Sequence, residues 1–215
     1  GGASIKAAIL NAEEGPIYIG KNTQIHEGAI VKGACSLGEE SHLNMGSKLR
    51  GDNTIGPHCK VGGEVSNSVF QGYSSKGHDG FMGNSVIGEW CNLGADTNIS
   101  NLKNNYSEVE VYNYLEEKPI KTGRQFCGLI MGDHSKAGIN TMFNTGSVVG
   151  FCANIFGAGF PPKFVPSFTW CDNDNISSSY QLDKALDTAQ RVYARRNKEL
   201  TEIDKKIFKN IYHNK

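Results

Sequence analysis

Aliphatic residues recur every six positions in the first part of the chain. The series has one member in each hexad: Ile19, Ile25, Val31, Leu37, Leu43, Leu49, Ile55 and Val61. A small or short residue follows four positions after each of them: Thr23, Ala29, Cys35, Ser41, Ser47, Asn53, Cys59 and Val65. This period fits neither the α-helix nor a strand with alternating faces. It is typical of an all-β solenoid in which each hexad forms one side of a triangular coil.

The cross-section of such a coil explains both series. Each short strand points one aliphatic side chain inward, and the corner that follows has room only for a small side chain. Turn residues point outward, while the backbone pairs with the coils above and below. The sequence therefore predicts stacked aliphatic ladders as the core.

The hexad pattern changes register after Val65. We expect the ladder to resume two positions out of register, at Val69, Ser75, Phe81, Ile87, Leu93 and Ile99. Residues 62–67 absorb the slip, which predicts either a bulge or a site. The pattern then stops at Ser100. The polar stretch of about 100–128 is too long for a turn, so we expect a loop that projects from the coil.

A third block of hexads follows the projecting loop, at Met131, Ala137, Phe143, Val149 and Ile155. We expect Pro161, Pro162 and Pro166 to end the solenoid, because proline cannot donate to a ladder. Helical spacing follows the serines at 177–179, with a serine as the cap. These patterns predict a solenoid over 3–168 and one or two helices over 177–213, packed on the coil or on a neighbouring subunit.

Composition narrows the class of partner. The 215-residue chain has a formal net charge of zero, so it carries no electrostatic footprint for nucleic acid or an anionic membrane surface. We found no apolar run of membrane-spanning length. Three of the six cysteines, Cys35, Cys59 and Cys91, fall at small corner positions. They predict buried, reduced thiols and a cytoplasmic location, although disulfides or metal binding remain alternatives.

The turn around His78 is the strongest candidate for chemistry. It follows a predicted strand, and Gly77 and Gly80 allow another group to approach the backbone. A neutral imidazole there could take a proton from an amine or hydroxyl that attacks a thioester. The alternative is an ordinary surface histidine.

The other candidates each have an ordinary interpretation as well. Glu64 lies at the register slip and could be only an exposed turn carboxylate, and Arg50 could be only a surface cation, although a guanidinium can bind phosphate. Four further histidines also fall at outward or turn positions: His26, His42, His58 and His134. They could bind zinc between subunits, but the chain lacks the His-x4-His pair of solenoid carbonic anhydrases. We therefore predict that no metal is required.

The segment from about Pro16 to Pro166 resembles a known family. It is similar to the acetyltransferase domain of bifunctional N-acetylglucosamine-1-phosphate uridyltransferase/glucosamine-1-phosphate acetyltransferase, and most to a variant group found in Bacteroidetes-like bacteria. The resemblance is carried by Ser75–His78, Ile87–Thr97 and Asn105–Tyr106. It implies a left-handed parallel β-helix and a nucleotidyltransferase domain that precedes this segment in the longer protein.

The resemblance also implies roles for single residues. His78 matches the proposed general base, and Glu64 matches an acidic residue near the acceptor. Arg50 matches an arginine that holds the sugar phosphate. The remaining matches are Asn101 or Asn105 with Tyr106 at the acceptor site, and Ala95 and Ile139 where the family contacts coenzyme A.

Three positions depart from the family pattern. Ser66 stands where the family has a phosphate-binding lysine, Phe81 replaces a tyrosine of the sugar site, and Asp96 replaces a glycine. One lost charged hydrogen bond is typically worth about 1.5–3 kcal/mol, so these departures bear on the identity of the acceptor.

The sequence thus predicts an acetyl-CoA-dependent N-acetyltransferase that works as a homotrimer in nucleotide-sugar biosynthesis. Its acceptor would be an amino-sugar phosphate, with glucosamine 1-phosphate favoured. The alternative is a non-catalytic trimerisation or regulatory solenoid attached to a sugar-1-phosphate nucleotidyltransferase. Ser66 and Phe81 favour this alternative, whereas His78 and Glu64 favour the enzyme.

Overall fold

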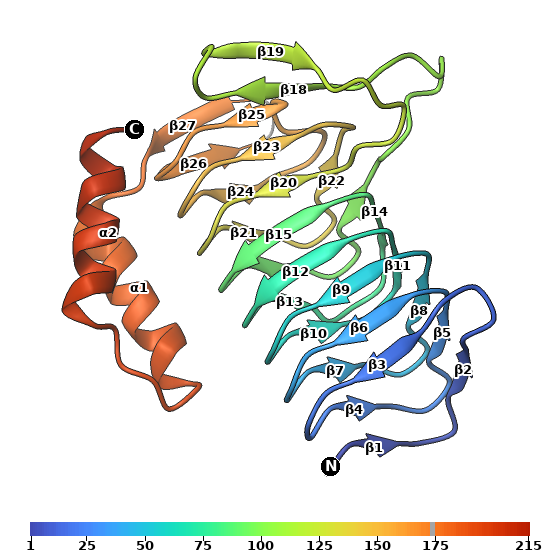
Figure 1. Ribbon diagram of the computed structural model, residues 1–215. Helices are drawn as coiled ribbons and strands as arrows, with labels where there is room; N and C mark the ends of the chain where they lie inside the picture. The colour runs from blue at the N-terminus through green and yellow to red at the C-terminus, as the bar shows by residue number, and fades with distance from the viewer. Residues whose placement is uncertain (173–174) are drawn as a thin grey trace.

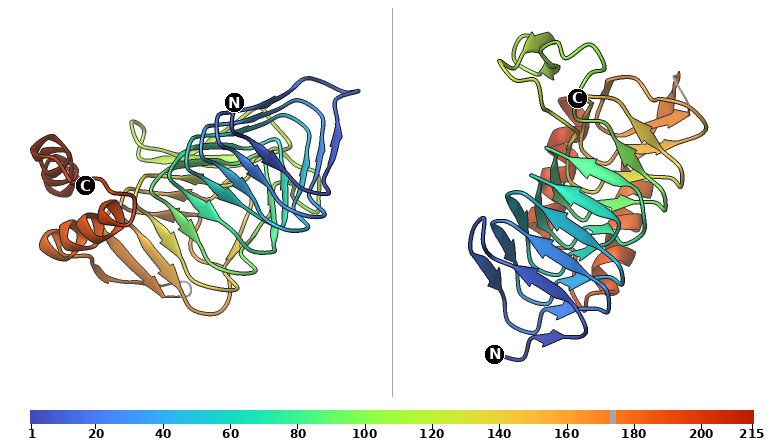
Figure 2. Two further views of the ribbon diagram at one scale, coloured as in Figure 1. Left: turned by 90° about the horizontal axis from the view of Figure 1, so that it is seen from below. Right: turned by 90° about the vertical axis from the view of Figure 1, so that its right-hand side faces the viewer.

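The computed structural model describes residues 1–172 and 175–215. Its strands stack as parallel ladders in three long sheets, which form the sides of a triangular solenoid (Figures 1 and 2). The solenoid is a left-handed parallel β-helix with a helical extension, as predicted.

Most coils contribute a short parallel strand to each sheet, and an antiparallel strand is added at the end of the first sheet. The first sheet contains β1 (Ser4–Ile5), β4 (Gln24–Ile25), β7 (His42–Leu43), β10 (Lys60–Val61), β13 (Ser75–Lys76), β16 (Asn92–Leu93), β21 (Lys136–Ala137), β24 (Asn154–Phe156), β26 (Thr169–Asp172) and β27 (Asn175–Ser179). The second contains β2 (Ile9–Asn11), β5 (Ile30–Lys32), β8 (Lys48–Arg50), β11 (Glu64–Ser66), β14 (Phe81–Gly83), β17 (Asn98–Ile99) and β22 (Met142–Phe143). The third contains β3 (Ile17–Ile19), β6 (Cys35–Leu37), β9 (Asn53–Ile55), β12 (Val69–Gly72), β15 (Val86–Glu89), β20 (Ile130–Met131), β23 (Val148–Val149) and β25 (Phe164–Val165).

The predicted ladders form the core. From Ile25 to Val61 every aliphatic member of the first series is buried, and Ile19 packs against the open end of the core. The small residues that follow are buried at the corners, including Cys35, Cys59 and Cys91 as free thiols. Burial raises the pKa of the Cys35 and Cys91 thiols to about 12, so they stay protonated.

The ladder after the register slip differs from the prediction at three positions. Val69, Ser75 and Phe81 are not the inward residues; their successors Phe70, Lys76 and Met82 are fully buried instead. From Ile87 onward the predicted residues are correct: Ile87, Leu93, Ile99, Met131, Ala137, Phe143, Val149 and Ile155. The prediction failed because the chain loses residues at several turns rather than at one.

The largest shortening occurs in the coil that follows β10. His42 pairs with Lys60, eighteen residues on, whereas Lys60 pairs with Ser75, only fifteen residues on. The turn between β10 and β11 consists of Gly62 and Gly63 alone. A side chain at Gly62 would meet the backbone of Gly77, so the coils approach closely there.

The projecting loop leaves the solenoid between β17 and β20. It carries a two-stranded antiparallel hairpin, β18 (Glu110–Asn113) and β19 (Lys118–Lys121), which lies beyond one end of the coils (Figure 1). The prolines at 161, 162 and 166 do not end the solenoid. They lie in connections on either side of β25, so β26 still pairs with β24 and no ladder bond is lost.

Two helices follow the last strand, α1 (Leu182–Ala194) and α2 (Glu202–His213). The predicted serine cap is wrong, since the N-cap of α1 is Gln181, without a side-chain bond. Both helices pack on the corner between the third and first sheets, where Ala185, Tyr193 and Phe208 are buried (Figure 2). No helix in the described part of the chain is long and apolar enough to span a membrane.

Aromatic rings stack along the corner that the helices cover. His58, Tyr73 and Trp90 come from successive coils, with centroid distances of 4.6 Å and 4.1 Å between neighbours. Tyr193 of α1 stacks on Trp90 at 4.2 Å. His134, which we expected in an outward or turn position, lies at the turn of the next coil but is buried beneath Phe208 of α2.

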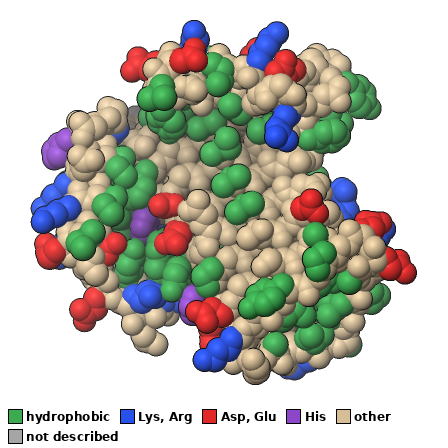
Figure 3. Space-filling view, viewed as in Figure 1, with side chains coloured by type: hydrophobic (Ala, Val, Ile, Leu, Met, Phe, Trp, Pro, Cys, Tyr) green, Lys and Arg blue, Asp and Glu red, His purple; other side chains and the backbone are tan. Residues whose placement is uncertain are grey.

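A row of aliphatic side chains lies on the outer face of the third sheet. Val69, Val86 and Ile130 are direct partners on β12, β15 and β20, and each is 37–40% exposed. Hydrophobic side chains are visible along this face in Figure 3.

Candidate functional site

A hollow of about 530 Å³ lies at the corner between the first and second sheets. Its walls come from the turns of five successive coils, which follow β4, β7, β10, β13 and β16. The lining residues are His26, Asn44, Met45, Gly62, Gly63, Gly77, His78, Asp79, Ala95 and Asp96.

The short Gly62–Gly63 turn explains the position of the hollow. The turns above and below it, at 44–47 and 77–80, have four residues each. The middle turn has two residues fewer and no side chains, so fewer atoms project there than from its neighbours. The register slip, which the sequence marked as a bulge or a site, therefore creates the recess.

His78 stands in the wall of this recess, and its side chain is exposed, as its expected turn position implies. Its turn is held from outside by Asn44, whose Nδ2 donates to the carbonyl of Gly77 at 2.6 Å. Ala95, the predicted coenzyme contact, lines the same recess one coil further on. The structure thus brings these two predicted residues together.

The same turn is held from inside by Lys76, a residue that the sequence analysis overlooked. Lys76 occupies an inward position of the first sheet, between Val61 and Leu93, and is fully buried. Its Nζ donates to the carbonyls of His78 at 2.9 Å, Asp79 at 3.1 Å and Gly62 at 3.4 Å. Burial lowers its pKa to about 8, although the charges of Asp79 and Asp96 oppose this shift.

A second hollow, of about 740 Å³, lies between the second sheet and the projecting loop. Arg50 and Asn101 both line it, as do Ser66 and Phe81, two of the positions that depart from the family pattern. Arg124 of the projecting loop also lines it. Two of the predicted acceptor residues and two of the three departures therefore share one cavity, whereas Asp96 lines the first hollow.

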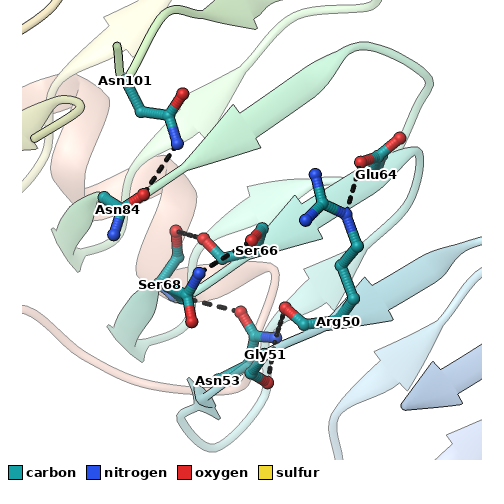
Figure 4. A network of polar contacts seen from close by, with 9 residues as sticks. Arg50, Gly51, Asn53, Glu64, Ser66, Ser68, Asn84 and Asn101 are labelled. Atoms are coloured by element: carbon teal, nitrogen blue, oxygen red, sulfur yellow. Dashed lines mark hydrogen bonds and ion pairs between the residues drawn. The ribbon is translucent and has the colours of Figure 1, made fainter. Parts of the chain in front are cut away.

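Glu64 does not line this second hollow but contacts Arg50, which does. Its Oε1 accepts from Nε of Arg50 at 2.8 Å, which leaves the two terminal nitrogens of the guanidinium for other partners (Figure 4). On the next strand Phe81 pairs directly with Glu64. Nearby, Nδ2 of Asn101 donates to Oδ1 of Asn84 at 2.7 Å (Figure 4).

Three predicted residues lie elsewhere. Asn105 lines a third hollow with Lys103 and Lys163, and its Oδ1 accepts from the backbone of Ser107. Tyr106 is 66% exposed, and its carbonyl accepts from Gln125 of the second hollow. Ile139 is 69% exposed and lies one coil beyond Ala95 at the same corner.

Three residues that line or support the hollows were not predicted from the sequence as parts of them: Lys76, Arg124 and His26. A lysine at a ladder position was a usable signal for Lys76, had the register been assigned correctly. Nothing local in the sequence places Arg124 beside Arg50, because the loop that carries it has no repeat. In the described part of the chain, no group of three His, Cys, Asp or Glu side chains is arranged to hold a metal ion.

Several known proteins are similar to this chain in part of their sequence or in fold. A bifunctional sugar-1-phosphate nucleotidylyltransferase/acetyltransferase from Sulfurisphaera tokodaii is 32% identical over 145 residues, which are 66% of this chain and 36% of that protein. The bifunctional protein GlmU of Methanococcus aeolicus is 38% identical over 87 residues, 40% of this chain and 20% of that protein. No family model matches the chain. The chain is therefore similar to the hexapeptide-repeat acetyltransferase domains of GlmU-like proteins.

Two further matches complete the comparison of this GlmU-like domain. A putative uncharacterized acetyltransferase, YaiX of Escherichia coli, is 27% identical over 66% of this chain and 61% of that protein. A putative acetyltransferase from Bacillus cereus, 13% identical, has a TM-score of 0.50 over 89% of this chain and 92% of its own, and shares the fold. The chain spans about a third of the Sulfurisphaera protein and a fifth of the Methanococcus protein.

Proposed function

We propose that this GlmU-like domain transfers an acetyl group from acetyl-CoA to the amine of an amino-sugar phosphate. Glucosamine 1-phosphate is the favoured acceptor, because the relatives are named as sugar-1-phosphate nucleotidylyltransferase/acetyltransferases and GlmU proteins. In the longer protein the domain would act beside a nucleotidyltransferase.

One observation carries this proposal: an exposed imidazole, that of His78, lies in a recess which the shortened coil opens between two longer turns. The amine nitrogen attacks the thioester carbonyl while neutral His78 accepts the ammonium proton that the new bond releases. The carbon–sulfur bond then breaks, and the thiolate of coenzyme A takes up the proton. The products are the amide and free coenzyme A.

The second hollow is proposed to hold the acceptor. The terminal nitrogens of Arg50 can bind a phosphate bidentately, and Glu64 would orient that guanidinium through Nε. Asn101 can form hydrogen bonds with sugar hydroxyls through its side-chain amide. Asn105 and Tyr106 lie on the same loop and would contact the parts of the ligands that extend beyond this hollow. Ala95 and Ile139, on successive coils of one corner, are proposed to contact coenzyme A.

A homotrimer is part of the proposal. Both hollows are open on the outside of the solenoid, so a second copy can complete them. The aliphatic row of Val69, Val86 and Ile130 supports this assembly, because an apolar surface of this kind is stabilised when a partner covers it.

Release of free thiol from acetyl-CoA, with glucosamine 1-phosphate as acceptor, tests the proposed reaction. We expect turnover by the wild type and at least a 100-fold lower kcat in His78→Ala, with unchanged affinity for coenzyme A by calorimetry. His213→Ala is the matched control, since this histidine is exposed at the end of α2. An intact assembly that neither releases thiol nor binds coenzyme A would instead be a non-catalytic scaffold.

A further inference from the structure

Lys76 is a charged residue in a position of the solenoid core that is otherwise apolar. Members of the first-sheet ladder are aliphatic or small on either side of Lys76, from Ile25, Leu43 and Val61 before it to Leu93 and Ala137 after it. A buried ammonium costs free energy unless its donors are satisfied, and a branched aliphatic residue would continue the ladder at no such cost. Local violations of this kind concentrate at functional sites.

The hydrogen bonds of Lys76 show which parts of the chain its buried ammonium stabilises. All three acceptors are backbone carbonyls of the turns that form the first hollow: Gly62 on one coil, and His78 and Asp79 on the next. The ammonium therefore ties the short turn to the turn that presents His78. Two of the three residues whose carbonyls it binds are adjacent in the chain, so the backbone on the carboxyl side of His78 is fixed at two successive peptides.

These bonds also set the direction of the neighbouring N–H groups. The described peptide bonds are trans, so the N–H of a peptide points opposite to its carbonyl. Because the carbonyls of His78 and Asp79 turn toward Lys76, the N–H groups of Asp79 and Gly80 point away from the core. Within the described chain neither donates a hydrogen bond to another residue, which leaves both as donors beside the imidazole.

We propose that Lys76 is a positioning residue: its buried ammonium holds the Gly77–Gly80 turn from inside, and so fixes His78 and the adjacent N–H groups over the first hollow. Asn44 completes the hold from outside through its bond to Gly77. The lowered pKa of Lys76 agrees with this geometry, since it reflects the burial that the arrangement requires. The activity measured below rests on the proposed function.

The central variant is Lys76→Met, which keeps an unbranched side chain of similar length and removes every donor. We expect an unfolding midpoint equal to or above that of the wild type, because a cation no longer has to be buried. We expect kcat to fall 10- to 100-fold with KM for acetyl-CoA within threefold, since misplacement of about 1 Å costs about this much. Lys76→Gln, which retains N–H donors, should recover part of the loss.

The matched control is Ile155→Met, a change of similar size in the same ladder that is far from both turns. It should leave kcat within threefold of the wild type. A second readout needs no activity: amide ¹⁵N order parameters at Gly77–Gly80 should fall in Lys76→Met and stay unchanged in the control.

The outcomes separate the two proposals. If the wild type releases no thiol, the proposed function fails, while the order parameters still test the hold of Lys76 on the turn. If Lys76→Met folds with a rigid turn and a kcat within threefold of the wild type, the positioning role is wrong. If neither Lys76 variant folds, the lysine serves the fold itself, and the proposal is overturned as well.

Discussion

Protonation of His134 should loosen the attachment of the helices to the solenoid. The imidazole is 6% exposed and packs among Phe151, Tyr193 and Phe208. Burial, reinforced by the charge of Lys136, lowers its pKa from 6.5 to about 3, while Asp204 opposes the shift weakly. The folded protein therefore keeps His134 neutral at pH values where the unfolded chain protonates it.

The magnitude follows from these two pKa values. Above pH 6.5 both states hold a neutral imidazole, and His134 makes stability independent of pH. As the pH falls below 6.5, only the unfolded state binds the proton, so stability decreases until the folded pKa near 3 is reached. At pH 5 the loss is about 2 kcal/mol, from 1.5 pH units at about 1.4 kcal/mol each.

Urea unfolding at pH 7.5 and pH 5, followed by tryptophan fluorescence, measures this loss, because one of the two tryptophans, Trp90, stacks against Tyr193 of α1. The variant His134→Phe keeps an aromatic ring and removes the titrating group. We expect its free energy of unfolding to fall by about 2 kcal/mol less than that of the wild type over this range. His42, whose pKa is also lowered by burial, contributes equally to both proteins. Equal losses in wild type and variant would refute the reasoning.

Three further predictions concern the acceptor, the coil stacking and the thiols. Arg50→Lys should raise KM for the sugar phosphate about tenfold with little change in kcat, because lysine cannot bind phosphate bidentately; steady-state kinetics with Lys21→Arg as control would show this. Gly56→Ala should destabilise the protein by about 3 kcal/mol in urea, because its Cβ would meet the carbonyl of Gln71, whereas Gly138→Ala has room and should be close to neutral. The half-buried Cys127 should react with a thiol reagent at pH 8 before Cys35 and Cys91, whose pKa burial raises to about 12; labelling followed by mass spectrometry would contradict this if Cys91 reacted first.

Most of the fold could be predicted from the sequence because the solenoid repeats one local rule. Wherever the coil keeps eighteen residues, the inward position follows by counting, as from Ile25 to Val61. The count fails at Phe70, Lys76 and Met82, because each shortened turn shifts the register and the sequence pattern revealed only one such place, at residues 62–67. A lysine facing inward also contradicts the expectation that charged side chains point to solvent.

The site could be predicted less completely than the fold. His78 and Ala95 belong to regular turns, so their common corner follows from the repeat. Arg50 and Asn101 lie near one corner of the stacked coils, but residues 123–126 of the projecting loop complete the hollow they share, and no repeat predicts how that loop folds. Asn105 and Tyr106 lie on that loop, where no periodicity constrains the backbone, and the structure separates them from Arg50.

The ring stack beneath the helices has a consequence for how the molecule comes apart. A bare solenoid is a one-dimensional array in which each coil touches only its neighbours, so it can unzip from an end, one coil at a time. Here Tyr193 and Arg196 bridge coils that are not adjacent, because Tyr193 stacks on Trp90 while Arg196 donates to the carbonyl of His58. If a coil between His58 and Trp90 unfolds, the contacts that the helical region makes with both are lost as well. The helical region thus links several coils along the solenoid axis. The coils around His78 should therefore unfold together rather than one after another.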